Sequence, residues 1–208
     1  MEKGSDGHIW LMVHSGSRNF GYKIAEYYNN IAKSLNEELK LVPPKHDLDG
    51  LYIDFKEGQE YFRAMNYALE FAAENRRQLL EQFYNIFIEE TGSEKILNKV
   101  SIHHNYAAIE KHFGEEVIVH RKGATRAGLG EFGIIPGSMG TPSYIVEGLG
   151  NDRSFHSCSH GAGRVMSRRQ ANKAITKEMA EKAMEGIVYK GFKKDLSEAP
   201  MAYKDIEE

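Results

Sequence analysis

The chain has 208 residues, of which 41% are hydrophobic and 27% are charged, and its formal net charge is −3. This is the composition of an ordinary globular protein that can bury a core without staples, and the charge neither requires nor excludes a nucleic-acid partner. A single cysteine, Cys158, excludes an intrachain disulfide framework and a zinc ribbon and fits a reducing cytosol. Because no apolar run reaches the length of a signal-peptide core or a membrane span, we expect a cytoplasmic protein.

The N-terminal half of the chain is predicted to be mainly helical. Residues 8–13 are apolar and bounded by Gly and Ser, which predicts a short buried strand that ends at His14. Apolar residues then recur at helical spacing over 21–40 and, after a loop, over 59–90, where Gly92 follows the helix end.

From residue 99 to 163 the pattern changes to short apolar runs separated by Gly, Ser, Pro and Thr. The runs at 117–119, 134–135 and 144–146 are typical of β-strands. Residues 167–189 are rich in Ala, Lys, Glu and Met and predict a final helix. The order of elements indicates an α+β fold whose loops carry the chemistry.

Charge is unevenly distributed along the chain. Between Arg121 and Lys177 there are nine basic residues and three acidic ones, although the whole chain is negative. Such a basic segment over Gly-rich loops suits a polyphosphate or a nucleic-acid backbone. A solvated surface is the alternative, and charge alone does not decide between the two.

Several histidines stand in distinctive contexts, namely His14 after a predicted strand, the pair His103-His104 before Asn105, and His120 and His160 next to Gly-rich segments. Neutral imidazole is a good ligand for borderline divalent metals. For any single one of these residues a hydrogen-bonded structural role is the stronger interpretation. The argument for a metal or catalytic site therefore depends on the set.

Residues 136–143 form a turn that is dense in glycine and hydroxyl side chains. Backbone N–H groups in such a turn can approach a phosphate or a base closely. The run matches neither the P-loop pattern nor the glycine spacing of a dinucleotide fold. Taken alone, a plain tight turn is favoured.

The segment from His160 to Arg164 places an imidazole beside glycines and a guanidinium, and a predicted helix follows it. A neutral imidazole can attack phosphorus while Arg and backbone amides hold the developing charge, so the segment suits phosphoryl or nucleotidyl transfer. A protease-like pair of Cys158 with a nearby histidine is the rival interpretation, but the usual nucleophile context is missing.

Together these motifs resemble the RtcB family of RNA-splicing ligases over nearly the whole chain. They occur in the family's order, which makes chance agreement implausible. The matching segments are 13–18 (VHSGSR), 102–105 (IHHN), 120–125 (HRKGAT), 136–140 (PGSMG) and 159–164 (SHGAGR).

The resemblance implies an α+β RtcB-like fold with mixed sheets and long flanking helices, in which residues 1–208 are the central and C-terminal part of a single catalytic domain. It implies a ligase that uses GTP and two manganese ions. Such a ligase joins RNA ends bearing a 2′,3′-cyclic phosphate or 3′-phosphate to 5′-hydroxyl ends through a guanylylated histidine, as in tRNA splicing or RNA repair. Archease is a possible activating partner.

Carried over position by position, His160 matches the guanylylated histidine, and His14 and His104 match manganese ligands. Arg121, Lys122 and Arg164 are expected to contact RNA or phosphate. The positions expected to contact the guanylate are His104, Asn105, Pro136, Gly137, Ser138, Met139, Ser143, His160, Gly161, Ala162 and Gly163.

The chain departs from the family pattern at both ends. The Asp and Cys metal ligands, the Asn-His-Phe motif and a C-terminal lysine have no counterpart in this sequence. We therefore expect an incomplete site, with weak manganese affinity and little or no ligation activity of this polypeptide alone. Two alternatives stay open, a catalytically dead RNA- or nucleotide-binding remnant and a metal-dependent phosphoesterase on the same scaffold. The physiological RNA and the oligomeric state are also open.

Overall fold

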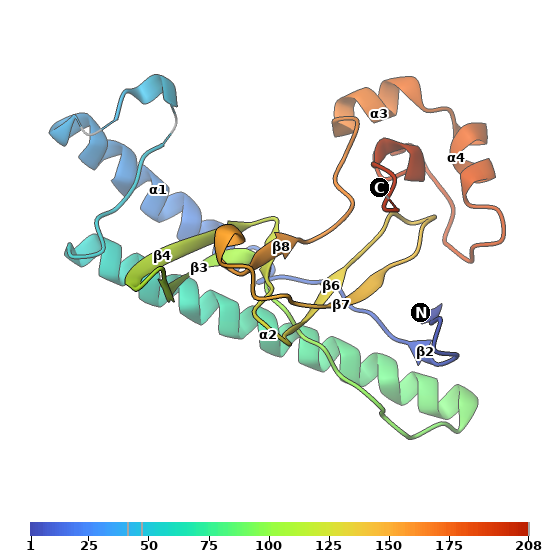
Figure 1. Cartoon of the computed structure of the whole chain (residues 1–208). Coiled ribbons are helices and arrows are strands. Elements are labelled where there is room, and N and C mark those ends of the chain that lie inside the picture. The colour runs from blue at the N-terminus through green and yellow to red at the C-terminus, as the bar shows by residue number, and fades with distance from the viewer. Residues whose placement is uncertain (41, 47, 208) are drawn as a thin grey trace. The chain divides into compact units, whose positions relative to one another are not determined.

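The computed structural model describes residues 1–40, 42–46 and 48–207, which form helices and short antiparallel strands (Figure 1). The expected α+β class is confirmed. The chain divides into two compact units, Met1–Lys99 and Val100–Glu208. That residues 1–208 belong to one catalytic domain stays a prediction. No helix in the described part of the chain is long and apolar enough to cross a membrane.

The N-terminal unit begins with a small hairpin of β1 (Glu2–Lys3) and β2 (Ile9–Trp10). Asp6 closes its turn, since its carboxylate accepts hydrogen bonds from the His8 N–H (2.9 Å) and the Trp10 indole (3.2 Å). The buried strand predicted over 8–13 is wrong in length and burial, because β2 has two residues and Ile9 is 47% exposed. A two-stranded ribbon leaves its faces open unless another element packs on it.

Two helices make up most of this unit, α1 (Phe20–Leu39) and α2 (Lys56–Thr91), with the short η1 (Pro44–His46) in the segment that connects them. Both predicted helices are confirmed to within a few residues. Lys40 ends α1 and Gly92 ends α2 in the left-handed conformation, at φ 53° and φ 68°. Glycine adopts that conformation without a Cβ penalty, so Thr91-Gly92 is a natural helix end.

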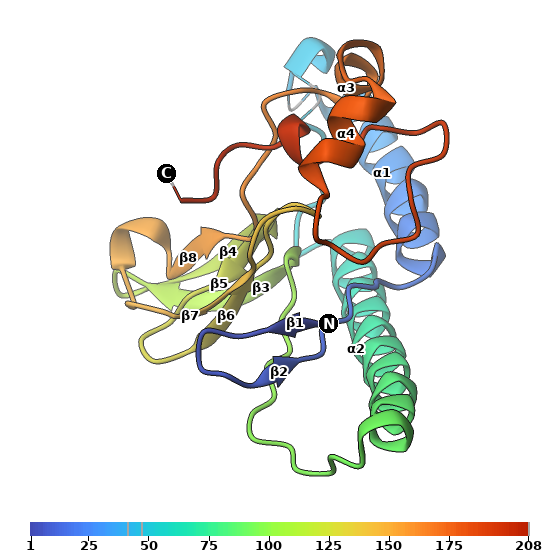
Figure 2. The ribbon, with the colours of Figure 1, turned by 90° about the vertical axis from the view of Figure 1, so that its right-hand side faces the viewer.

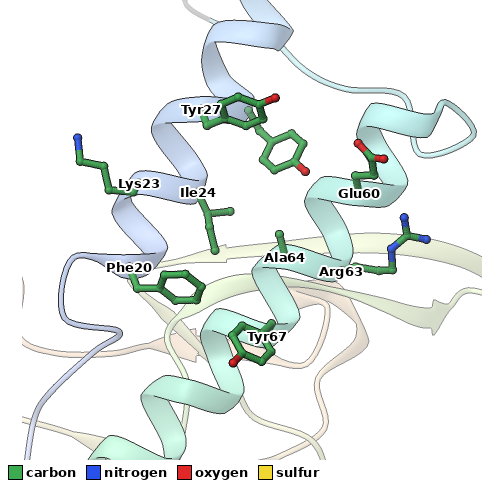
Figure 3. Close-up of a pocket in the computed structure, with 9 residues that line it drawn as sticks. Phe20, Lys23, Ile24, Tyr27, Glu60, Arg63, Ala64 and Tyr67 are labelled. Atoms are coloured by element: carbon green, nitrogen blue, oxygen red, sulfur yellow. The ribbon is translucent and has the colours of Figure 1, made fainter.

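The helices pack through small residues and aromatic rings. Ala32, Ala68 and Ala72 are buried, and the ring of Phe20 lies 5.7 Å from that of Tyr67 in an edge-on arrangement. Beside these contacts the two helices leave an open groove of about 640 Å³. Figure 3 shows Phe20 and Ile24 of α1 directed toward α2 across this groove.

The C-terminal unit contains three two-stranded sheets, all antiparallel, where mixed sheets were expected (Figure 2). The predicted runs at 117–119, 134–135 and 144–146 lie in strands, so this part of the prediction is confirmed. The pairs are β3 (Asn105–His112) with β4 (Glu115–Lys122), β5 (Ala124–Arg126) with β8 (Ser157–Ser159), and β6 (Phe132–Ile135) with β7 (Tyr144–Glu147).

The β3–β4 hairpin is the longest of these sheets. A tight turn at Phe113 and Gly114, both at positive φ, joins its strands, as hairpin turns of this kind require. Opposite residues of an antiparallel pair point to the same face. Tyr106 is opposite Arg121, and Glu110 lies four residues further along β3 on that face. The buried face of the hairpin therefore carries charged side chains as well as apolar ones.

The end of the chain is helical, but not as one helix. The single helix predicted over 167–189 is wrong, because the structure has α3 (Arg168–Ala174) and α4 (Lys177–Ala183). Ile175 is extended between them, and the Thr176 side chain caps α4 by accepting from the Met179 N–H (3.2 Å). A threonine that caps a new helix offers the backbone an alternative to continuing the old one.

A small core fixes these helices against η3 (Pro200–Ala202). Its fully buried members are mostly alanines, which allow close approach of the backbones. They are Ala171, Ile175, Ala180, Ala199 and Ala202. A short η2 (Asp152–Ser154) lies earlier, in the loop that leads to β8.

Candidate functional site

The position of His160 is set by the short strand β8. Because Ser159 pairs with Ala124 of β5, the residue after β8 lies next to the residue before β5, which is Gly123. The N–H of Gly123 in turn donates to the carbonyl oxygen of His104 (2.8 Å). Two segments 56 residues apart in sequence, at His104 and at His160, are brought together in this way.

The rings of His104 and His160 are stacked, with centroids 5.0 Å apart and an angle of 16° between their planes. Both side chains are half-buried. A Cβ on Gly123 would lie 3.0 Å from Cε1 of His160, and Gly123 also has φ 66°. Gly123 thus leaves room for the ring of His160, and any larger residue there would push against it.

The Gly-rich turn after β6 lies beside the same loop. A Cβ added to Gly161 would lie 3.3 Å from the carbonyl oxygen of Pro136, so the two segments approach closely. The turn is closed by the Thr141 hydroxyl, which accepts from the Ser138 N–H (2.7 Å). Gly137 has no space for a side chain, because its Cβ would lie 2.2 Å from the Pro142 carbonyl oxygen.

The other residues predicted to contact the guanylate lie in these two loops or next to them. Asn105 opens β3, and its side-chain oxygen accepts from the Gly123 N–H at 3.0 Å. Met139 is 44% exposed at the tip of the turn, and Ser143 directly precedes β7. Gly163 is at φ 77° and its carbonyl oxygen accepts from the N–H of Lys204 (3.1 Å). Ala162 lies between the two glycines of this loop.

His14 belongs to the N-terminal unit and is exposed. The residues after it are tied to α2, since the Asn75 side chain donates to the Ser15 hydroxyl (2.9 Å) and the Gly16 carbonyl (3.0 Å). Within residues 1–40, 42–46 and 48–207, no group of three or more His, Cys, Asp or Glu side chains could hold a metal ion. The described residues therefore do not by themselves fit a manganese site.

Arg121 is buried, with 2% of its surface exposed. It makes five hydrogen bonds, and a guanidinium has five N–H donors. The acceptors are the Ser157 hydroxyl, the Tyr106 hydroxyl, both Glu110 carboxylate oxygens and the Phe155 carbonyl. The five donors of Arg121 are thus engaged by protein groups, and the RNA or phosphate contact expected of it stays a prediction. Lys122, the next residue on β4, is exposed and keeps that expectation.

Arg164 is also held by protein groups, and its side chain is 22% exposed. It donates to the Met166 carbonyl (2.9 Å), the Tyr203 hydroxyl (3.0 Å) and the Ser197 carbonyl, and it forms an ion pair with Glu198. These contacts fasten the loop after His160 to the C-terminal helical region. An RNA contact of Arg164 stays a prediction.

The sequence interpretation missed Glu110 of β3. In the structure it pairs with Arg121, which in turn contacts Ser157 of β8. The Glu110 carboxylate is bidentate to Arg121 at 2.5 and 3.0 Å and also contacts Nε2 of His112 at 3.0 Å. The hydrogen bond from Arg121 lowers the pKa of Glu110 from 4.5 to about 2, although burial opposes this shift. A charged residue at an inward position of a strand was the available signal.

The chain is similar to known proteins over nearly its whole length. A family model described as "tRNA-splicing ligase RtcB" matches residues 2–208. The chain belongs to the RtcB family. An RNA-splicing ligase RtcB of Escherichia coli K12 is 42% identical to it over 210 residues, which cover 96% of this chain and 50% of that protein.

More distant RtcB proteins agree. The RNA-splicing ligase RtcB of Mycobacterium tuberculosis is 34% identical over 98% of the chain and 52% of its own length. The tRNA-splicing ligase RtcB of Aeropyrum pernix is 32% identical over 97% of the chain and 47% of its own length. This RtcB-family chain thus spans about half the length of the curated relatives it matches.

Proposed function

We propose that the protein acts as an RNA ligase of the RtcB type, in which His160 carries a guanylate. In this proposal it joins RNA ends with a 2′,3′-cyclic phosphate or a 3′-phosphate to ends with a 5′-hydroxyl, in the cytoplasm. The observation that supports this most is the stacked pair His104–His160 beside the Pro136 turn, in a chain of a family named for RNA splicing.

The proposed nucleophile is a ring nitrogen of His160. It attacks the α-phosphorus of GTP, a phosphorus–nitrogen bond forms, and pyrophosphate leaves with the electrons of the broken phosphoanhydride bond. Where the RNA ends in a 2′,3′-cyclic phosphate, water first opens the ring by breaking the P–O2′ bond. The resulting 3′-phosphate then takes the guanylate from His160, the phosphorus–nitrogen bond breaks, and the 5′-hydroxyl of the second RNA end displaces GMP. A half-buried ring that packs against a second imidazole is restricted in orientation, which favours a defined line of attack.

The residues around His160 fit a nucleotide. Gly123, Gly137 and Gly161 keep side chains out of the space beside the ring and the adjoining turn. Backbone N–H groups and small hydroxyl side chains, such as that of Ser138, are the donors that phosphates and bases accept from. In the proposal the guanylate contacts His104, Asn105, the 136–139 turn, Ser143 and the 161–163 loop.

Two manganese ions are part of the proposal, with His14 and His104 as ligands. When bound, such ions neutralise and orient phosphates as Lewis acids. Two imidazoles do not make a complete site for these ions. RNA is the proposed partner of the exposed Lys122 and of the basic segment 121–177. Archease is retained as a possible activator.

Labelling with [α-32P]GTP and manganese tests the role of His160. The samples are the 208-residue chain and any longer natural product of the same reading frame, with and without archease. We expect acid-labile label on the longer product and weaker label on the 208-residue chain, and none on either sample when His160 is replaced by Ala. The control is His8→Ala, an exposed histidine outside the candidate site. Label that persists in His160→Ala would show the assignment wrong.

A second assay tests the reaction class. RNA with a 3′-phosphate end and RNA with a 5′-hydroxyl end should be joined only when GTP is present. Release of inorganic phosphate from the RNA without GTP consumption or labelling would instead indicate a phosphoesterase. RNA binding without labelling or joining would indicate a non-catalytic RNA-binding protein.

A further inference from the structure

A buried polar network contacts the start of β8, the strand that directly precedes His160. Arg121, on β4, is 2% exposed, and its carboxylate partner Glu110, on β3, is 9% exposed. Two of the five acceptors of Arg121 lie just ahead of His160 in the chain, namely the Phe155 carbonyl (2.9 Å) and the Ser157 hydroxyl (2.9 Å). The guanidinium thus connects the long β3–β4 hairpin to the start of β8.

Apart from Arg121, strand β8 is held by short-range contacts such as the Ala127 N–H to the His156 carbonyl (2.6 Å) and the Thr125 hydroxyl with the Cys158 thiol (3.4 Å). It is three residues long, and its ladder with β5 is equally short. Short two-stranded pairs are marginal on their own. His160 follows β8 immediately, so a shift of β8 moves the imidazole relative to His104 and Gly123. A catalytic group needs a position held to a fraction of an ångström.

Burial of this ion pair has a physical cost that its neighbours must offset. Removing a carboxylate and a guanidinium from water costs several kcal/mol per ion, and buried pairs are often no more stabilising than apolar residues of similar volume. Here all five N–H donors of Arg121 are satisfied in a planar fork that lysine cannot reproduce. Such a network serves geometry more than stability.

We propose that Glu110, Arg121 and Ser157 are positioning residues, which hold β8 and thereby set the ring of His160 against that of His104. This inference rests on the proposed function for its catalytic consequence, but the geometric part does not depend on it. None of the three residues needs to touch a nucleotide or RNA. Glu110 aligns Arg121, and Arg121 aligns Ser157 and the Phe155 carbonyl.

The first experiment measures ring position without any ligand. The Hε1 protons of the nine histidines are recorded by NMR at one pH, and those of His104 and His160 are assigned with His→Gln variants. Stacked rings shift each other's resonances, so these two signals report their relative placement. We expect Arg121→Lys and Ser157→Ala to move both signals, whereas Ser34→Ala, a hydroxyl deletion on α1, should move neither.

The second experiment separates positioning from stability. In guanylylation assays, Arg121→Lys should lower kcat by up to about 100-fold with KM for GTP unchanged, as expected for a misplaced nucleophile. Ser157→Ala removes the hydroxyl that accepts from Arg121 Nε (2.9 Å) and donates to the Phe155 carbonyl (3.0 Å), and it should lower kcat less because the Glu110–Arg121 pair remains. Ser157→Thr, which keeps the hydroxyl, should restore the rate and the His160 signal. Glu181→Gln, on the exposed ion pair with Lys177 in α4, is the matched charge control.

The outcomes distinguish the two proposals. Folded Arg121→Lys and Ser157→Ala chains with unmoved His104 and His160 signals would overturn the positioning role. Absence of labelling in the unaltered protein would overturn the proposed function, and the NMR result would still decide the positioning role. If Arg121→Lys unfolds, the Ser157 variants carry the test, because they leave the buried ion pair intact.

Discussion

Two glutamates of this chain, Glu74 and Glu110, each have a pKa lowered from 4.5 to about 2, and in both the first cause is a hydrogen bond from an arginine. Their surroundings differ. Glu74 and its partner Arg77 lie on the surface of α2 with about half of each side chain exposed (51% and 50%). Glu110 and Arg121 have side chains that are 6% and 1% exposed.

The comparison teaches that a lowered pKa does not measure what an ion pair does. At the surface of α2, water and salt screen both charges, and either partner can be solvated when the other is removed. Next to β8, loss of Arg121 leaves Glu110 buried with only its weaker contacts to His112 and Arg126. The exposed pair on α2 therefore affects little beyond its own side chains, whereas the buried pair Glu110–Arg121 supports the fold around β8. Four measurements test this difference between the exposed and the buried ion pair.

Replacement of the buried arginine is expected to have the largest effect. Arg121→Met should lower the free energy of unfolding of the 208-residue chain by about 3 kcal/mol, because the buried Glu110 loses its bidentate partner and keeps only Nε2 of His112 (3.0 Å) and the half-exposed Arg126 (3.5 Å). The double variant Glu110→Leu, Arg121→Met should be less destabilised than the single one. Urea unfolding followed by circular dichroism measures both. If Arg121→Met lowered the free energy of unfolding no more than Arg77→Met does, the difference between the two pairs would be contradicted.

The pH dependence of stability should come next in size. Because folding lowers the pKa of Glu110 from 4.5 to about 2, its contribution is present above pH 4.5 and is lost as the pH falls toward 2. The shift corresponds to about 3 kcal/mol. Urea unfolding is measured from pH about 6 down to about 2.5. The free energy of unfolding of the unaltered chain should exceed that of Glu110→Gln at the higher pH, and this difference should shrink as the pH falls. A constant difference would argue against the lowered pKa.

Two glycines in the left-handed conformation, one after α2 and one beside His160, allow a third test. Gly92→Ala and Gly123→Ala should each cost about 1–2 kcal/mol, since a Cβ is disfavoured at φ 68° and φ 66°. Only Gly123→Ala also meets a ring, at 3.0 Å from Cε1 of His160, whereas nothing lies within 4 Å at Gly92. The His160 Hε1 signal should therefore move in Gly123→Ala alone. Equal NMR spectra for both variants would show that Gly123 does not constrain the ring.

The smallest effect is expected at the surface pair. Arg77→Ala should leave the urea midpoint nearly unchanged, and any difference at low ionic strength should vanish at high salt, because exposed charges are screened. The same salt series should leave the cost of Arg121→Met unaltered. A salt-independent loss of stability in Arg77→Ala would place the two pairs in the same class.

The two long helices could be predicted from the sequence, over residues 21–40 and 59–90. Their helical spacing of apolar residues and the Gly92 stop predict α1 and α2 closely, because helix periodicity and end signals are local properties of the chain. The motifs at His104, the Pro136 turn and His160 were likewise recognisable as a set, because each depends on residue types that lie side by side in the sequence.

Other features were decided only by tertiary structure. The strand predicted over 8–13 and the single helix over 167–189 were wrong because pairing and capping at Ile9 and Thr176 depend on what packs nearby. Arg121 and Lys122 are adjacent and both basic, yet one faces the interior and the other faces water. Strand alternation separates them, and the partner that makes Arg121 structural, Glu110, comes from a different strand. Local sequence carries no signal of that contact, because it forms only when β3 pairs with β4 in the observed register.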